Sequence, residues 1–204
     1  MMPRRMPVTV VLATGNAGKL REMREILAPW NVEVRSQGDY TRTAAEETGL
    51  TFIENALLKA RHAAAASGLP AIADDSGLEV DALRGAPGIH SARYAGPGAD
   101  DQANNERLLR ELAGIAAAAR TARYRCAMVF LRWAHDPAPV IAQAAWEGVI
   151  ADAPRGSGGF GYDPLFLVDD GARTAAELAA EDKNRRSHRG RALRDLVDAL
   201  TTAS

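Results

Sequence analysis

The sequence predicts an α/β fold, because apolar runs typical of strands alternate with stretches of helical spacing. Val8–Ala13 is a continuous, β-branched run that indicates a buried central strand, and helical spacing follows over Leu20–Leu27. A longer helix is expected to begin near Thr51, and the apolar run Leu69–Ala73 behind it indicates another buried strand. The length of 204 residues suits one domain, or one domain with two lobes.

Charge and cysteine content exclude several classes of function. The net charge of −1 argues against a protein that binds electrostatically along nucleic acid, although basic residues gather at 183–189. The single cysteine, Cys126, lies in an apolar run, excludes an intramolecular disulfide and fits a reducing cytoplasm. No apolar run could span a bilayer, and the run at 8–13 is too short for a signal peptide. We expect a cytoplasmic protein with no membrane or nucleic-acid partner, and a disordered tail at residues 1–7.

The turn after the first strand has the features of a phosphate site. Backbone N–H groups and the dipole at a helix N-terminus favour an anion there, and Lys19 adds a point charge suited to phosphate. The spacing is not that of a Walker A loop, since Leu20 follows the lysine. An ordinary β–α turn that uses glycine for its geometry is the alternative. The turn consists of Thr14, Gly15, Asn16, Ala17, Gly18 and Lys19.

The next elements are a strand, a polar loop and a helix with clear ends. Val32–Ser36 indicates a strand, and residues 38–45 are polar and typical of a loop. Thr51 and Glu54 form a capping-box pattern, so the helix is expected to start at Thr51. Gly68 is a good stop for its C-terminus.

Polar residues before and within this helix are candidates for binding. Glu46 and Glu47 precede the helix, where they could meet a metal ion held by aspartates after the following strand. The alternative is a solvated acidic pair favoured by the helix dipole. Asn55 and Lys59 lie four residues apart and share one helix face. Lys59 is either a phosphate ligand or a solvated surface residue.

Two adjacent aspartates mark the stretch where we expect the chemistry. Asp74–Gly77 is predicted to be the turn that leaves the strand Leu69–Ala73. Because side chains alternate along a strand, Asp74 and Asp75 should point opposite ways. One can then hold a metal ion or a water in a cleft while the other bonds local backbone. Hard cations such as Mg²⁺ take carboxylate oxygens beside substrate phosphates. An Asx-turn with both carboxylates solvated is the alternative.

The middle of the chain is expected to be structural. His90 could serve as an acid or base, but an exposed or structural histidine is the preferred interpretation, and Cys126 is expected in the core. The predicted elements are a half-exposed strand at Leu78–Leu83, a glycine-rich loop at Arg84–Tyr94, a helix at Asp100–Leu112, and a β-hairpin of Tyr124–Trp133 with Val140–Trp146.

A second glycine-dense stretch, Gly156–Pro164, could let backbone approach a ligand closely. Phe160 and Tyr162 offer rings on which a base could stack. The alternative is a wide loop whose aromatic rings pack against the protein.

The C-terminal helix is expected to start after Ser187, a plausible N-cap. His188 and Arg189 would then lie in its first turn, where the dipole disfavours cations. That placement suggests a functional use, and a basic surface run is the alternative.

Taken together, the motifs resemble those of the inosine triphosphate pyrophosphatase family, whose bacterial members are dITP/XTP pyrophosphatases. The matching segments are Thr14–Lys19, Glu46–Ala56, Ile72–Leu78, Gly85–Tyr94, Gly158–Pro164 and Lys183–Arg189. The resemblance implies Mg²⁺-dependent hydrolysis of ITP, dITP or XTP to the monophosphate and pyrophosphate by a homodimer, which cleanses the nucleotide pool. It also implies a long, curved mixed β-sheet with flanking helices that form two lobes around a central cleft. Residues 1–204 would then be a single pyrophosphatase domain.

The resemblance also implies roles for individual residues. Asp75 would be a Mg²⁺ ligand and the general base, Glu46 or Glu47 would complete the metal shell, and Lys59 would assist catalysis. A metal-bound carboxylate is a poor base by itself, whereas the metal lowers the pKa of bound water. The implied substrate-binding residues are Thr14, Gly15, Asn16, Ala17, Gly18, Lys19, Asn55, Ser76, Phe160, Gly161, Tyr162, Asp163, Lys183, His188 and Arg189.

Base selection would follow from donors around the purine. The resemblance implies that Phe160 stacks against the base. It also implies that the base is surrounded by Asp163, Lys183, His188 and Arg189. Donors suit the oxygen at position 6 of hypoxanthine and xanthine and disfavour the amino group of adenine. The same argument does not explain how guanine is rejected. A general or pyrimidine triphosphate pyrophosphatase and a non-catalytic nucleotide-binding module remain as alternatives.

Overall fold

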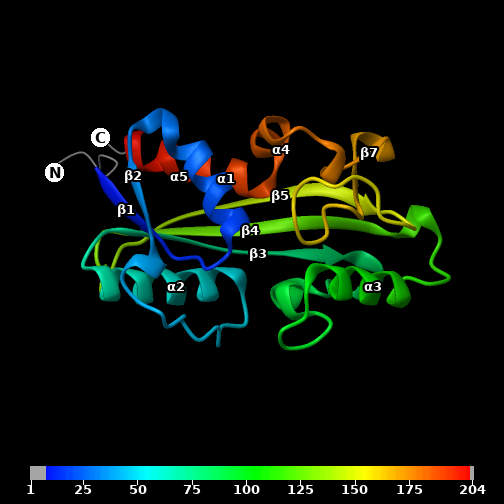
Figure 1. Ribbon diagram of the computed structural model, residues 1–204, viewed down its shortest axis with the longest axis horizontal. Coiled ribbons are helices and arrows are strands. Elements are labelled where there is room, and N and C mark those ends of the chain that lie inside the picture. Colours follow the sequence, from blue (N-terminus) through cyan, green and yellow to red (C-terminus); the bar gives the residue numbers. More distant parts are fainter. Residues whose placement is uncertain (1–7, 203–204) are drawn as a thin grey trace. The chain divides into compact units, whose positions relative to one another are not determined.

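The computed structural model describes residues 8–202, except for the side chain of Asp170. The tail expected at residues 1–7 lies outside the described residues. Over residues 8–202 the fold is α/β, with an open seven-stranded sheet in the order β2-β1-β3-β4-β5-β6-β7 and flanking helices (Figure 1). The sheet is mixed, because β1 is parallel to β2 and β3 whereas β6 is antiparallel to β5 and β7. The α/β class and the mixed sheet are therefore confirmed.

The bounds of the elements are as follows. The strands are β1 (Thr9–Leu12), β2 (Glu33–Ser36), β3 (Ala71–Val80), β4 (Thr121–Leu131), β5 (Val140–Ile150), β6 (Phe166–Val168) and β7 (Arg173–Thr174). The α-helices are α1 (Ala17–Leu27), α2 (Phe52–Ser67), α3 (Asp101–Glu111), α4 (Ala180–Arg186) and α5 (His188–Thr202). Short 3₁₀ turns are η1 (Ala28–Trp30), η2 (Gln37–Asp39), η3 (Asp81–Leu83), η4 (Gly88–Arg93), η5 (Ala117–Ala119), η6 (Asp169–Gly171) and η7 (Ala175–Glu177).

The chain divides into two compact units. Unit 1 contains the described residues up to Asp75, then Cys126–Ala144, and those from Arg189 onward. Unit 2 contains Ser76–Arg125 and Ala145–His188. The division falls within β3, β4 and β5, so these strands contribute residues to both units. No helix in the described part of the chain has the length and apolarity needed to span a membrane.

Unit 1 has a core on each face of its part of the sheet. Alternation along β1 sends Val10 and Leu12 into a cluster with α1 and α5, and sends Val11 into a cluster with α2. Figure 1 shows α1 and α5 on one side of these strands and α2 on the other. The buried face of α2 is made of alanines, among them Ala56 and Ala60, so that helix can lie close to the strands. The predicted interior strand is confirmed.

The predicted ends of α2 are confirmed in atomic detail. Thr51 is the N-cap, its side chain accepts a hydrogen bond from the N–H of Glu54, and Glu54 Oε2 accepts from the N–H of Thr51 at 2.9 Å. At the other end Gly68 has a φ of +67°, the left-handed conformation that glycine tolerates best. These signals are local in sequence, which explains why the sequence alone located the helix.

The predicted turn at Asp74–Gly77 is wrong. β3 continues without interruption from Ala71 to Val80, so both aspartates lie inside a strand. Of the separate strand expected over Leu78–Leu83, residues 78–80 are the end of β3 and Asp81–Leu83 form the 3₁₀ turn η3. Aspartate is usually disfavoured in the interior of a strand. Here Asp74 and Asp75 each have cationic side chains as partners, which removes the need for solvent at a turn. The predicted alternation of the two carboxylates is confirmed, because they meet different helices.

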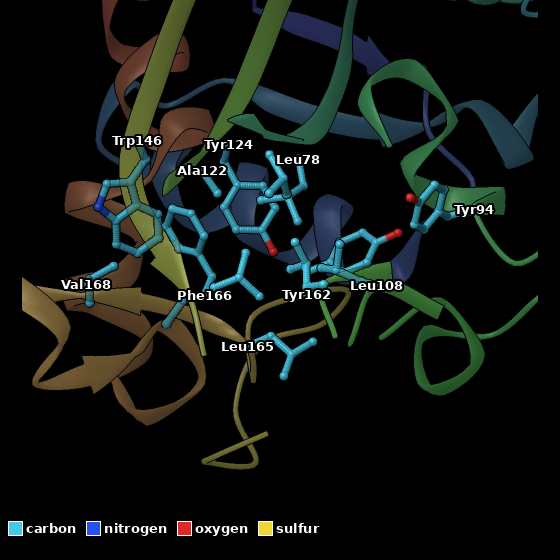
Figure 2. Close-up of a cluster of buried hydrophobic side chains, with 14 of the residues drawn as sticks. Leu78, Tyr94, Leu108, Ala122, Tyr124, Trp146, Tyr162, Leu165, Phe166 and Val168 are labelled. Carbon is cyan, nitrogen blue, oxygen red and sulfur yellow. The ribbon is translucent and has the colours of Figure 1, made fainter. Parts of the chain in front are cut away.

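Unit 2 has an aromatic core. Figure 2 shows Tyr124, Trp146 and Phe166 packed together, and the ring centroid of Phe166 lies 4.6 Å from that of Tyr124 and 5.5 Å from that of Trp146. α3 contributes the buried Leu108 to this core, and its predicted position is confirmed. The predicted hairpin is confirmed, since β4 and β5 are neighbours joined by residues 132–139. The sequence analysis missed the short helix α4.

Candidate functional site

The predicted phosphate turn is shorter than expected, because α1 already begins at Ala17. Asn16 is the N-cap, and its side chain accepts a hydrogen bond from the N–H of Lys19 at 3.0 Å. Thr14 Oγ1 accepts from the N–H of Asn16 at 3.1 Å, which closes the turn. The first N–H groups of a helix have no acceptor within it, so those of Ala17 and Gly18 are suited to an anion.

A hollow of about 490 Å³ adjoins this turn. Its lining includes Thr14, Asn16 and Ala17 of the turn, together with Arg42 and Thr43 of the following loop. A volume of this size is in the range of small-ligand sites. The phosphate turn is thus a concave and partly cationic surface of unit 1.

Lys19 is tied to a buried ion network on one face of β3. Its Nζ lies 2.9 Å from Asp74 Oδ2, and Arg189 Nε lies 3.2 Å from the same oxygen. The other end of the Arg189 guanidinium lies 2.6 Å from Glu22 Oε2. Burial alone would raise the pKa of Asp74, but Lys19 and Arg189 outweigh it and hold that pKa far below its usual range.

This network bears on two sequence-based predictions. One of the two aspartates was expected to bond local backbone, yet the recorded partners of Asp74 are cations from α1 and α5. The Arg189 side chain is only 3% exposed and is held by Asp74 and Glu22, so its predicted contact with the base stays a prediction. The guanidinium compensates both buried carboxylates in this structure.

The opposite face of β3 presents Asp75 to α2. Lys59 Nζ lies 2.6 Å from Asp75 Oδ1 and 2.9 Å from Glu47 Oε1. Burial raises the pKa of Asp75 in spite of the attraction of Lys59. Burial tends to lower the pKa of Lys59, but Asp75 and Asp74 outweigh it and the net pKa rises. The structure therefore brings Glu47 to Asp75 through a shared lysine, whereas Glu46 is exposed.

Two buried polar atoms beside this cluster lack a hydrogen-bond partner within residues 8–202. They are Asp75 Oδ2 and Asn55 Nδ2. Asn55 Oδ1 is engaged, because it accepts from the N–H of Gly49 at 2.9 Å. A Cβ at Gly49 would meet Glu54 and Asn55 within 3.0 Å, so only glycine lets this loop pack on the start of α2. That contact, which the sequence analysis missed, orders the segment that carries Glu47.

The residues present fit a magnesium ion. Residues 8–202 contain no group of three or more His, Cys, Asp or Glu side chains placed to hold a metal. Mg²⁺ does not need one, since it binds through one or two carboxylates, with waters and substrate phosphates as its other ligands. Glu47 and Asp75 supply two carboxylates, and Asp75 Oδ2 is a buried acceptor without a hydrogen bond.

In unit 2, Asp163 is the centre of a second polar cluster. Its Oδ2 accepts from the N–H of Phe160 at 2.9 Å and lies 2.7 Å from Lys183 Nζ, which is itself 4.6 Å from the centroid of the Phe160 ring. The Tyr124 hydroxyl donates to Asp163 Oδ1 at 3.2 Å. Gly159 has a φ of +74° and any Cβ there would collide with Asp163. The loop therefore wraps around this carboxylate.

His188 joins the cluster through Tyr124. The two rings are stacked, with centroids 4.6 Å apart and planes at 8°, and His188 is buried. The sequence analysis treated Tyr124 only as a strand residue. No local pattern could have marked it, because Asp163 and His188 are far away along the chain.

The Tyr162 ring is not available for stacking a base, so that interpretation is wrong. The residue is 4% exposed and packs in the aromatic core (Figure 2). Its hydroxyl donates to the carbonyl oxygen of Ser91 at 2.8 Å. Among the other predicted positions, Ser76 follows Asp75 within β3 and is half-buried, Gly161 continues the loop, and His90 is exposed.

Replacing Tyr162 by Phe is expected to lower the free energy of unfolding by about 1 kcal/mol, because one buried hydrogen bond is lost. The KM for a nucleotide substrate should stay within twofold of wild type, since the ring is part of the core. Urea unfolding and steady-state kinetics measure the two effects. A severalfold rise in KM without loss of stability would mean that Tyr162 contributes to substrate binding.

Comparisons with known proteins cover nearly the whole chain. Residues 10–199 match the model of the Ham1 family, and all segments that carried the resemblance lie within this range. The chain is 60% identical over 191 residues to the dITP/XTP pyrophosphatase of Thioalkalivibrio sulfidiphilus, covering 94% of this chain and 97% of that relative. It is 56% identical to the dITP/XTP pyrophosphatase of Escherichia coli O157:H7, with the same coverage. A HAM1 protein from Coxiella burnetii superposes with a TM-score of 0.87 at 47% identity, covering 97% of this chain and all of that one.

Proposed function

The chain belongs to the Ham1 family, and from this premise we propose that it is a nucleoside triphosphate pyrophosphohydrolase that converts ITP, dITP and XTP to the monophosphate and pyrophosphate. The observation that carries the proposal is the buried Asp75 carboxylate, with one oxygen held by Lys59 and the other without a hydrogen bond from any residue in the range 8–202. Relatives of 56–60% identity that are named dITP/XTP pyrophosphatases support the same substrate class.

The phosphate turn binds the triphosphate in this proposal. The backbone N–H groups at Ala17 and Gly18 and the side chain of Lys19 receive phosphate oxygens, and Lys59 adds positive charge. Asn55 Nδ2, buried and without an acceptor, is a further donor for the substrate. These groups orient the triphosphate and neutralise its negative charge. Positioning and charge stabilisation are most of what the protein contributes to phosphoryl transfer.

Asp75 and Glu47 are the residues that would hold Mg²⁺. When bound, Mg²⁺ supplies a Lewis acid that lowers the pKa of water and neutralises charge on the phosphates. Asp75 orients the attacking water and accepts its proton, while Lys59 holds the other carboxylate oxygen in place. The water oxygen bonds to the α-phosphorus as the bond to the bridging oxygen breaks, and pyrophosphate leaves.

The cluster around Asp163 binds the base. Phe160 stacks against the purine, and Lys183 and His188 provide donors for the oxygen at position 6 of hypoxanthine or xanthine. Adenine carries an amino group at that position and would leave these donors unpaired. Asp163 holds Lys183 in place, and Tyr124 holds the His188 ring in place.

The proposal also covers the domain organisation, the oligomeric state and the location of the protein. We interpret unit 1 and unit 2 as the two lobes of a single pyrophosphatase domain, because one family model runs through both. A homodimer that works in the cytoplasm on free purine nucleotides completes the proposal.

Pyrophosphate release from ITP, dITP, XTP, GTP, ATP and dUTP, with and without Mg²⁺, tests the proposed function. We expect strong release from ITP, dITP and XTP that disappears when EDTA removes the metal. A flat profile across all six nucleotides would favour a general triphosphate pyrophosphatase. Nucleotide binding without any release would favour a non-catalytic binding module.

A further inference from the structure

We propose that Asp101 and Asn105 of α3 are positioning residues for base recognition, because they clamp the loop that presents Phe160. The inference rests on the proposed function, since it takes Phe160 as the ring that stacks the base. Neither residue was a candidate on sequence grounds, and neither belongs to the cluster around Asp163.

The clamp acts on both peptide groups of Gly161. Asp101 Oδ2 accepts a hydrogen bond from the Gly161 N–H at 2.6 Å, and Asn105 Nδ2 donates to the Gly161 carbonyl at 2.9 Å. Residues four apart share one face of a helix, so both side chains can reach the same glycine. The Gly161 N–H belongs to the peptide group that also contains the Phe160 carbonyl. Holding it fixes the backbone immediately after Phe160.

Phe160 is therefore held on both sides. Asp163 accepts from its N–H, and Asp101 holds the peptide group that follows it. Gly159 and Gly161, on either side, have φ values of +74° and +63°. Glycines have wide conformational freedom, so a loop built this way needs external restraints to keep one conformation.

Polar contacts rather than packing supply these restraints on the α3 side. A hollow of about 430 Å³ lies between the helix and the loop, lined by Asp101, Asn105 and Phe160 among others. α3 itself is firmly anchored, because Asp100 caps its N-terminus and Leu108 is fully buried in the core. A rigid helix thus holds Gly161 through two hydrogen bonds at the edge of this hollow.

The test uses Asp101→Ala and Asn105→Ala, with Asp101→Asn as a conservative variant that keeps an acceptor for the Gly161 N–H. Gln102→Ala is the matched control, because Gln102 lies on the same helix and lines the same hollow but bonds Glu106 at 2.9 Å. For both alanine variants we expect the KM for ITP to rise about tenfold with kcat within twofold. Because adenine and hypoxanthine both present a ring face to Phe160, kcat/KM for ATP should fall by a similar factor, whereas competitive inhibition by inorganic tripolyphosphate should not change.

Two further readouts make the outcome decisive. Asp101→Asn and Gln102→Ala are expected to keep the wild-type KM for ITP. Hydrogen exchange over residues 156–164 in the nucleotide-free protein should be faster in the alanine variants than in the control. An unchanged KM for ITP in the alanine variants, weaker tripolyphosphate inhibition, or unchanged exchange would overturn the clamp. If wild-type protein released no pyrophosphate from ITP, the proposed function would fail, while the exchange measurement would still judge the clamp.

Discussion

Asp75→Asn is expected to lower kcat for pyrophosphate release from ITP by about 10³-fold, within the range attributed to a lost general base. The variant removes the acceptor for the proton of water and weakens a proposed metal ligand, while Lys59 keeps Glu47 as a partner. Because burial raises the pKa of Asp75, its ionised carboxylate is less stable in the folded protein than in the unfolded chain. The neutral amide avoids that cost, so the melting temperature should not fall.

The matched control for this substitution is Asp198→Asn, an exposed aspartate on α5. It is expected to leave kcat and the melting temperature unchanged. Single-turnover measurements at saturating Mg²⁺ separate chemistry from product release. A kcat for Asp75→Asn within threefold of wild type would remove Asp75 from the mechanism. A collapse of the melting temperature would mean that its role is structural.

Asp74→Asn is expected to lower the free energy of unfolding at pH 7 by about 3–5 kcal/mol, the usual cost of removing one partner from a buried ion pair. Asp74 lies between Lys19 and Arg189, and its loss would leave Arg189 with Glu22 as its recorded carboxylate partner. Urea unfolding at constant ionic strength measures the difference. Asp81→Asn is the control, because Asp81 pairs with Arg123 at 2.8 Å but is exposed, and exposed pairs contribute little.

The effect of Asp74→Asn should depend on pH. The folded-state pKa of Asp74 is depressed below its ordinary value of 3.8, so its stabilisation is complete well above pH 3.8. It is lost as pH falls below that value, because the unfolded chain takes up the proton first. The gap between wild type and variant should therefore be full at pH 7 and shrink as pH falls from about 5 to 3. A gap that does not change over this range would mean that the ionised carboxylate is not what stabilises the fold.

The sequence alone determined those features that depend on neighbouring residues. The capping box of Thr51 and Glu54 and the glycine at 68 defined α2, since each signal is a contact within a few positions. The continuous run at Val8–Ala13 predicted an interior strand, and the turn that follows it predicted a helix N-terminus. Local hydrogen bonds and periodic burial depend on residues that are close together in the sequence. This explains why the sequence alone predicted these elements.

Only the tertiary structure decided how charged and aromatic side chains are used. Two adjacent aspartates predicted a turn, but cations from α1, α2 and α5 allow Asp74 and Asp75 to lie within β3. The same contacts bring Glu47 to Asp75 and hold Arg189 between Asp74 and Glu22. A buried charge is tolerated only beside an opposite charge or a hydrogen-bond partner, and those partners lie far away along the chain. Their identity therefore depends on which distant elements the fold brings together.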